Sequence, residues 1–215
     1  MAKQVDPQKT AQDGRALGEQ GERTRAKLMD AARIAFRERG YTGVRVDDIT
    51  QKAGTSHGAF YLYFSNKAEI LEALAGQTAE EMYVLADDLE GIEIGEAGYE
   101  QLRDWVDRFI DSYERHAPIV TAWISADAED SRFDELGREV LAQFARRISH
   151  AIERAVDQGL RHPVHPGTAA VALVAMLERL CYFWLVRGGP FKRDVVVDTL
   201  AAIWYEAIFG QKLHT

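Results

Sequence analysis

The stretch that decides the fold is residues 47–71, which read DDITQKAGTSHGAFYLYFSNKAEIL. Its pattern predicts two short helices, at residues 46–53 and 57–64, joined by a turn that begins with Gly54. Helices of two turns or fewer are marginal in water on their own, so we expect longer helices on either side to hold them in place. Glycine permits the left-handed backbone that a tight turn requires, and the arrangement therefore predicts a helix-turn-helix motif.

The second short helix of such a motif is the element that enters the major groove of DNA. We expect Ile49, Ala53 and Phe60 to form the small core between the two helices. Thr55 and Ser56 precede the second helix as possible N-caps. The residues left to face a groove are then His57, Gly58, Ala59, Tyr61 and Tyr63.

Helical periodicity continues through nearly all of the remaining sequence. One helix should end at Gly40, and a long one should run from Ser65-Asn66 to Leu89. Pro118 should end another helix and separate it from a short one at residues 119–125. Because no segment alternates apolar and polar residues as a strand would, we predict an all-α fold of about nine helices.

Composition and charge narrow the class of protein. The chain has 215 residues, 47% hydrophobic and 28% charged, as in ordinary globular proteins, and its single Cys cannot form an intrachain disulfide. The net charge of −8 is uneven: residues 1–75 carry +2 and residues 76–215 carry −10. The first third therefore tolerates a polyanion better than the remainder does.

Two further observations concern location. The most apolar segment, residues 169–186, is interrupted by Glu178 and Arg179, and so we expect no membrane span. Residues 1–20 lack the apolar run of a secretory signal. We therefore expect a cytoplasmic protein.

The region from Arg23 to Leu74 resembles the DNA-binding domain of TetR-family transcriptional regulators. The resemblance is carried by Arg39-Gly40-Tyr41, by A-G at 53–54, by F-Y-x-Y-F at 60–64 and by N-K-x-x-x-L at 66–71. The C-terminal part resembles the EthR-like subgroup in MLERL at 176–180 and AIWYEAIFG at 202–210. The resemblance implies an arm at residues 1–20, a DNA-binding domain at 21–68, and a ligand-binding and dimerisation domain at 69–215.

The resemblance also implies which residues touch DNA. His57 and Gly58 occupy positions that contact base edges, whereas Ala59, Tyr61, Tyr63 and Lys67 occupy positions at or near the phosphates. Arg45 stands where the family often has a capping Ser or Thr, and it adds a cation near the DNA backbone. Asp47 lies where a phosphate could approach. The full expected set is Arg45, Ser56, His57, Gly58, Ala59, Tyr61, Tyr63 and Lys67.

An apolar, aromatic-rich helical interior is where drug-sized ligands bind, although for any single aromatic residue ordinary core is the safer interpretation. With the resemblance to the EthR-like subgroup, the expected pocket residues are Leu102, Trp105, Phe109, Tyr113, Trp123, Val174, Leu177 and Trp204. This set contains no Lys or Arg, which favours a neutral or weakly polar hydrophobic effector, or the acyl part of a larger one.

The function expected is that of a homodimeric repressor that binds a near-palindromic operator in double-stranded DNA and is released by a small hydrophobic effector. The last two helices should supply the dimer contact, from Val171, Val174, Ala175, Leu185, Leu200 or Ile203. We expect no cofactor and no catalytic residue.

Two other classes of function are compatible with the sequence. The chain could be a non-regulatory carrier of hydrophobic molecules with a vestigial helix-turn-helix, or an all-α enzyme with Glu178 as its only conceivable acid. His162 and His165 flank a proline in a loop, where they lack the helical spacing of metal ligands, and we expect no metal site. Cys181 lies in an apolar helix and is expected to be a small buried hydrophobe.

Overall fold

A computed structural model describes residues 18–127, 132–160 and 164–210. Within these ranges the chain is all-α and contains no strand, as predicted. The elements are α1 (Glu19–Gly43), α2 (Val46–Ala53), α3 (His57–Tyr61), α4 (Lys67–Asp88), a 3-10 turn η2 (Leu89–Gly91), α5 (Glu96–Asp127), α6 (Arg132–Asp157), α7 (Pro166–Cys181), a π-helical turn η3 (Tyr182–Val186) and α8 (Arg193–Phe209).

The described residues form eight α-helices, and the expectation of about nine was too high by one because of Pro118. This proline lies inside α5, so residues 119–125 continue the preceding helix. Proline removes one helical hydrogen bond, but Ile119 and Ala122 on the following turn are fully buried, and their packing holds the helix together. The helix α3 is also shorter than expected and ends at Tyr61.

Most of the expected helix ends are confirmed. The backbone of Gly40 leaves the helical conformation at φ 66°, and a last short turn follows it before α2. Asn66 is the N-cap of α4, where its side chain accepts a hydrogen bond from the Glu69 N–H. The expected arm at residues 1–20 lies mostly outside the described residues, and its last two residues, Glu19 and Gln20, already belong to α1.

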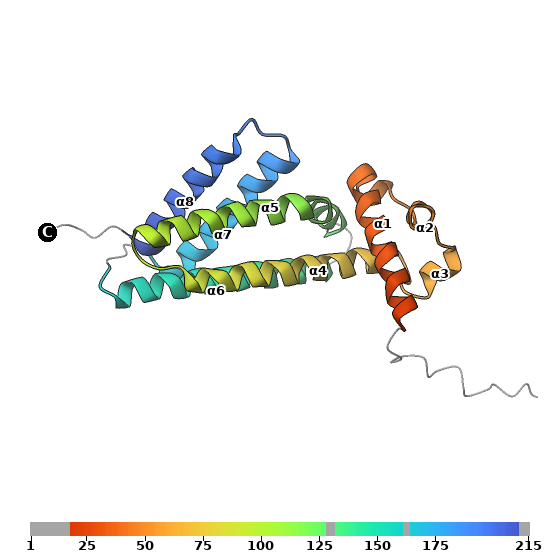
Figure 1. Cartoon of the computed structure of the whole chain (residues 1–215), viewed down its shortest axis with the longest axis horizontal. Coiled ribbons are helices and arrows are strands. Elements are labelled where there is room, and N and C mark those ends of the chain that lie inside the picture. The colour runs from red at the N-terminus through yellow and green to blue at the C-terminus, as the bar shows by residue number, and fades with distance from the viewer. Residues whose placement is uncertain (1–17, 128–131, 161–163, 211–215) are drawn as a thin grey trace, which may run out of the picture.

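The helices build two hydrophobic cores. The first lies among α1, α2, α3, the beginning of α4 and the end of α5, and it includes Leu28, Phe36, Ile49, Phe60, Ile70, Leu74 and Ile119. The second lies among the remaining part of α4 and α5 and the helices α6, α7 and α8, and it includes Leu85, Trp105, Phe109, Ile148, Leu177 and Trp204. In Figure 1 the first core is at the end of the molecule that carries α1, α2 and α3.

Both α4 and α5 pass from one core into the other. Leu74 and Ala75 belong to the first core and Met82 to the second, and on α5 the order is reversed, with Tyr113 in the second and Ile119 in the first. Figure 1 shows the two helices extending side by side away from α1. A domain boundary at residue 68 therefore falls within the first turn of a helix that serves both cores.

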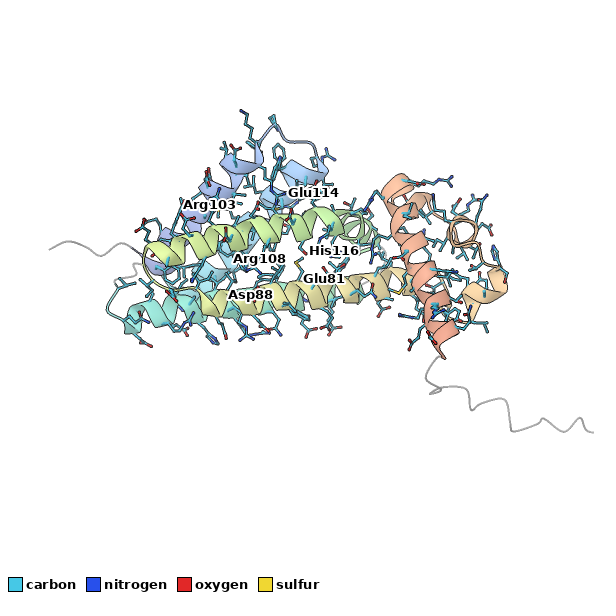
Figure 2. The ribbon with its side chains drawn as sticks, in the orientation of Figure 1. Glu81, Asp88, Arg103, Arg108, Glu114 and His116 are labelled. Carbon is cyan, nitrogen blue, oxygen red and sulfur yellow. The ribbon has the colours of Figure 1, made fainter. Side chains whose placement is uncertain are left out.

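A buried polar contact joins α4 to α5 between the two cores. Thr78 Oγ1 donates to the carbonyl of Leu74 at 3.0 Å and lies 3.2 Å from Nδ1 of His116. Nε2 of His116 lies 2.9 Å from a carboxylate oxygen of Glu81, and Figure 2 shows these two side chains between the helices. The threonine hydroxyl thus joins the backbone of α4 to the His116 ring, and that ring lies between Thr78 and Glu81.

The segment Pro166–Val186 is long and apolar enough to cross a membrane by length and composition, which the sequence argument did not expect. Only 33% of the most apolar stretch of this segment is buried, so the segment also presents an apolar face outward. In the fold it packs against α6 and α8 and its inner residues, such as Leu173 and Leu177, belong to the second core. The segment Pro166–Val186 is therefore a core helix whose outer apolar face is uncovered.

The contact between Glu81 and His116 should make stability depend on pH. The hydrogen bond from His116, with Arg115 and Arg33 nearby, holds the pKa of the Glu81 carboxyl below its usual value of 4.5. A carboxyl whose pKa is lowered by folding stabilises the protein above its ordinary pKa, and this contribution disappears as the pH falls through the lowered value.

We expect Glu81→Gln to lower the free energy of unfolding at pH 7 by about 0.5–1 kcal/mol, since the carboxylate is half exposed. The difference from the unchanged protein should shrink toward zero as the pH falls through the lowered pKa of the folded state, below which the carboxyl is protonated in both states. Denaturant unfolding of both proteins between pH 7 and pH 3 measures this difference. A constant difference across that range would contradict the assignment.

Candidate DNA interface and ligand pocket

The helix-turn-helix forms as the sequence predicts. Gly54 follows α2 with φ 63° and ψ 35°, in the left-handed region. Ile49 and Phe60 are fully buried between the two short helices, and Ala53 is half-buried beside them. The side chain of Ser56 accepts from the Ala59 N–H at 3.1 Å, so Ser56 is the N-cap of α3. The motif is thus held by local chemistry at both ends of the turn.

The start of α2 is stabilised by Asp48 in place of a capping hydroxyl. Its carboxylate accepts the backbone N–H of Arg45 at 2.9 Å and a guanidinium N–H of Arg39 at 2.5 Å. The backbone hydrogen bond, together with the Arg39 charge, holds the pKa of Asp48 below its usual value. The carboxylate therefore remains charged at the helix N-terminus, where it complements the helix dipole, and the exposed Arg45 makes no side-chain cap.

The residues expected to contact DNA differ in how exposed they are in the structure. Arg45, Ser56, His57, Gly58 and Tyr61 are exposed on one end of the molecule, and Ala59 is half-buried. The side chain of Tyr61 is 57% exposed, and its ring contacts the rings of Phe60 and His57.

Two of the residues expected to face outward are partly turned inward. Tyr63 is half-buried and packs against the first core. Lys67 donates to the backbone carbonyl of Tyr41 at 2.7 Å, and its ammonium lies 4.1 Å from the centre of the Tyr41 ring. In the free protein Lys67 therefore joins the start of α4 to the end of α1.

A side-chain contact that the sequence did not predict lies on this surface. Nε2 of His57 contacts the carboxylate of Asp47. Both side chains are more than half exposed, so the pair joins α2 to α3 on the outside of the motif. The only sequence signal was the position of Asp47 beside a possible phosphate.

The second core contains an apolar cavity of about 320 Å³. Six of the eight residues predicted to line it do so: Phe109, Tyr113, Trp123, Val174, Leu177 and Trp204. Leu102 and Trp105 are buried but do not line the cavity. The indole of Trp105 stacks behind Phe109 at 5.6 Å and donates to the carbonyl of Leu85 at 2.7 Å, so it supports the wall from outside.

Sequence reasoning missed the contributions of α4 and α6. The additional lining residues are Thr78, Ala79, Met82, His116, Val120, Ile124, Gly137, Arg138, Val140, Leu141, Phe144 and Glu178. The expectation that no Lys or Arg faces the cavity was wrong, because Arg138 borders it. The spacing of Val140, Leu141 and Phe144 on one helical face was the available signal for α6.

Polar groups along the cavity differ in whether they have partners. Glu178 pairs with the adjacent Arg179 at 3.7 Å. The Tyr113 hydroxyl and the Trp204 indole N–H are buried and have no hydrogen-bond partner among the described residues. Burial, with the nearby Glu178 carboxylate, raises the pKa of the Tyr113 phenol, so the group stays protonated and can donate.

Cys181 and His165 have structural roles in this region. Cys181 is fully buried, and burial raises the pKa of its thiol to about 12, as expected for a structural cysteine. His165 is the N-cap of α7, and Pro166 occupies the first turn. No metal-binding cluster occurs among the described residues, and His162 lies outside them.

Comparison with known proteins identifies the class to which this fold and site belong. Residues 28–74 match "Bacterial regulatory proteins, tetR family", and residues 102–210 match "Transcriptional regulator EthR, C-terminal domain". The chain therefore belongs to the TetR family and has an EthR-like C-terminal domain. It is a helix-turn-helix transcriptional regulator, of a family whose members are typically repressors with a ligand-binding C-terminal domain.

Particular relatives agree over most of the chain. The HTH-type transcriptional repressor SCO4008 of Streptomyces coelicolor is 29% identical over 181 residues, which cover 81% of this chain and 84% of the relative. The crystal structure of PfmR of Thermus thermophilus matches with a TM-score of 0.66 at 21% identity, over 85% of this chain and 98% of that one. FadR of Bacillus subtilis, solved with stearoyl-CoA, matches with a TM-score of 0.65 at 17% identity, over 85% and 98% respectively.

The pair between Asp47 and His57 leads to a prediction about DNA affinity. The Asp47 carboxylate repels phosphates and holds the His57 side chain in contact with it. Asparagine would keep a hydrogen bond to His57 without the charge. We expect Asp47→Asn to raise affinity for the operator about 3–10-fold at low salt, and by less at high salt because of screening.

Asp88→Asn is the matched control, because it removes the same charge at the far end of α4. That end is roughly 30 Å from the helix-turn-helix, at 1.5 Å per helical residue, and lies beyond a Debye length. Fluorescence anisotropy with operator DNA at two salt concentrations compares the two variants. Equal affinities for both would show that Asp47 does not face the phosphates.

Proposed function

We propose that this chain is a homodimeric repressor that leaves its operator when a small, mainly apolar effector enters the cavity of the second core. The observation that carries the proposal is the position of the cavity. Its wall includes Thr78 and His116, which form the polar contact between α4 and α5 at the junction of the two cores. An effector that presses on this wall would displace α4, whose first turn adjoins the helix-turn-helix.

The chemistry of the cavity favours an effector with a large apolar part. Most lining side chains are aliphatic or aromatic, and a cavity of this size holds a small drug-sized molecule or part of a larger one. FadR of Bacillus subtilis was solved with stearoyl-CoA, and an acyl chain is a group that such a cavity would accept. Arg138, at the cavity border, is suited to the more polar end of such a ligand.

A dimer is needed because one short recognition helix contacts too few bases for specific affinity. Two copies about 34–36 Å apart on a near-palindromic operator would read two half-sites. The uncovered apolar residues of α7 and α8 supply a surface for pairing: Val171 is 59% exposed and Ile203 is 43% exposed. The acidic residues 76–215 would keep the remainder of each subunit away from DNA.

A regulator of this kind would act beside the chromosome, in the cytoplasm, and we assign it no catalytic residue. Glu178, the one acid considered for an enzyme, forms an ion pair with Arg179 at the cavity wall. The vestigial-motif alternative is not favoured, because the match to the TetR family covers the helix-turn-helix itself. Arg45, Ser56, His57, Gly58, Ala59, Tyr61, Tyr63 and Lys67 remain the proposed DNA-contacting set.

The dimer surface can be tested with single substitutions. Val171→Glu or Ile203→Glu places a charge on exposed positions, so we expect a folded protein with weakened self-association. Leu200 belongs to the same helix as Ile203 but is buried, so Leu200→Glu should instead unfold the domain. Sedimentation velocity, combined with circular dichroism, distinguishes these results. A folded wild-type monomer at micromolar concentration would contradict the proposal.

The coupling of effector to DNA can be tested after native mass spectrometry has identified a ligand that co-purifies with the dimer. A coupling of about 1–3 kcal/mol would lower operator affinity by roughly 5–150-fold, and operator would weaken ligand binding by the same factor. Calorimetric titration of that ligand with and without saturating operator measures both effects. Equal ligand affinities in the two titrations would describe a binder that is not a switch.

Phe109→Ala should weaken ligand binding and leave DNA binding by the unliganded protein unchanged, because Phe109 lines the cavity far from α3. Phe209→Ala is the matched control, since it removes the same ring from the same core at a position outside the cavity lining. We expect both variants to lose a similar free energy of unfolding, about 3–5 kcal/mol. Any weakening of ligand binding that is found in Phe109→Ala but not in Phe209→Ala therefore comes from the cavity and not from lost stability.

A further inference from the structure

Two hydrogen-bond donors in the cavity lining have nothing to donate to. The Trp204 indole N–H and the Tyr113 hydroxyl are buried without a partner among the described residues, and both side chains line the cavity. A buried donor without an acceptor is costly, and native proteins seldom retain one without a reason. Trp105, in contact with Trp204, shows the usual solution, since its own indole donates to the carbonyl of Leu85.

The neighbouring polar groups of the lining do not accept hydrogen bonds from these two donors. The oxygen of Thr78 and both nitrogens of His116 are already used between α4 and α5. Glu178 pairs with Arg179 and makes no hydrogen bond with Tyr113, although its charge acts on the phenol. The lining, which is mostly apolar, therefore offers two buried donors that have no partner among the described residues.

We infer that the effector is an apolar molecule with a neutral carbonyl group, as in a ketone, ester or amide, whose oxygen accepts hydrogen bonds from Trp204 and Tyr113. This inference rests on the proposed function and specifies the chemical class of its effector. A carboxylate is disfavoured at this place because the negative charge of Glu178 lies close to Tyr113. A hydrocarbon would leave both donors unpaired, as they are in the free protein.

The two polar atoms are covered by neighbouring atoms in the free protein. A carbonyl oxygen reaches them only if the side chains that line the cavity move apart. Binding of the carbonyl therefore both pairs the donors and widens the cavity, whose wall includes Thr78 and His116 at the junction of α4 and α5. The hydrogen bonds would favour the same displacement that the proposed release from DNA requires.

The test uses four probes with the same heptyl chain, whose binding to the full-length protein is measured by calorimetry or tryptophan fluorescence. They are heptyl methyl ketone, the matched alkene in which a methylene group replaces the carbonyl oxygen, octanoate and octylammonium. We expect the ketone to bind about tenfold more tightly than the alkene, and more tightly than either charged probe, at pH 7. No saturable ketone binding, equal ketone and alkene affinities, or tighter binding of octanoate or octylammonium would each overturn the inference.

Two variants identify the donors. Tyr113→Phe and Trp204→Phe should each reduce the ratio of ketone affinity to alkene affinity several-fold, because the alkene controls for changes in cavity shape. Tyr99→Phe, on a tyrosine that packs edge-on against Tyr205 outside the cavity lining, should leave the ratio unchanged. Ratios in both variants equal to the wild-type ratio would overturn the assignment of these donors.

A second readout needs no ligand. Tyr113→Phe removes only an unpaired buried hydroxyl, so the melting temperature of the free protein should stay the same or rise. A clear fall would show that the hydroxyl already has a partner and would overturn the inference. Operator release is measured separately. A ketone that binds with the expected preference but does not release DNA would contradict the proposed function, whereas the preference of the cavity for a neutral carbonyl would stand.

Discussion

The sharing of α4 and α5 between two hydrophobic cores is the constraint on which the rest of the structure depends. Each core uses one end of each helix, so neither core can shift along α4 or α5 without moving the other. The transition occurs at Thr78 on one helix and His116 on the other, where the packing changes from apolar to hydrogen-bonded. A polar contact is directional, unlike apolar packing, and it therefore fixes the register between the two helices at this point.

The same constraint explains how a cavity in one core can matter to a motif in the other. The cavity wall includes Thr78 and His116, so a ligand acts on the junction itself and needs no longer chain of contacts. At the other end of α4, Lys67 is joined to the carbonyl of Tyr41 and Asn66 caps the helix, so movement of α4 is transmitted to the end of α1. Displacement of one helix is thereby linked to the position of the recognition helix α3.

The sequence predicted what depends on local chemistry and missed what depends on distant contacts. Gly54, Ser56 and Asn66 act through their own backbone surroundings, and their roles were all foreseen. Pro118 was misjudged because the burial of Ile119 in a core far away in sequence outweighs the lost hydrogen bond. In the cavity, aromatic type identified four lining residues, but Trp105 and Phe109 lie only one helical turn apart and nothing local indicates which of the two faces the cavity. The contact of Asp47 with His57 likewise exists only once α2 and α3 cross.

Stability and recognition place opposite demands on the cavity lining. A core selected for stability alone would have phenylalanine at 113 and 204, because unpaired buried donors favour unfolding. Retention of both donors beside an apolar cavity is understandable if a bound ligand pairs them and so stabilises the bound state relative to the free state. A ligand can shift an equilibrium only by its differential affinity for two states. Donors that are unpaired in one state and paired in the other supply such a difference at the point where α4 can respond to it.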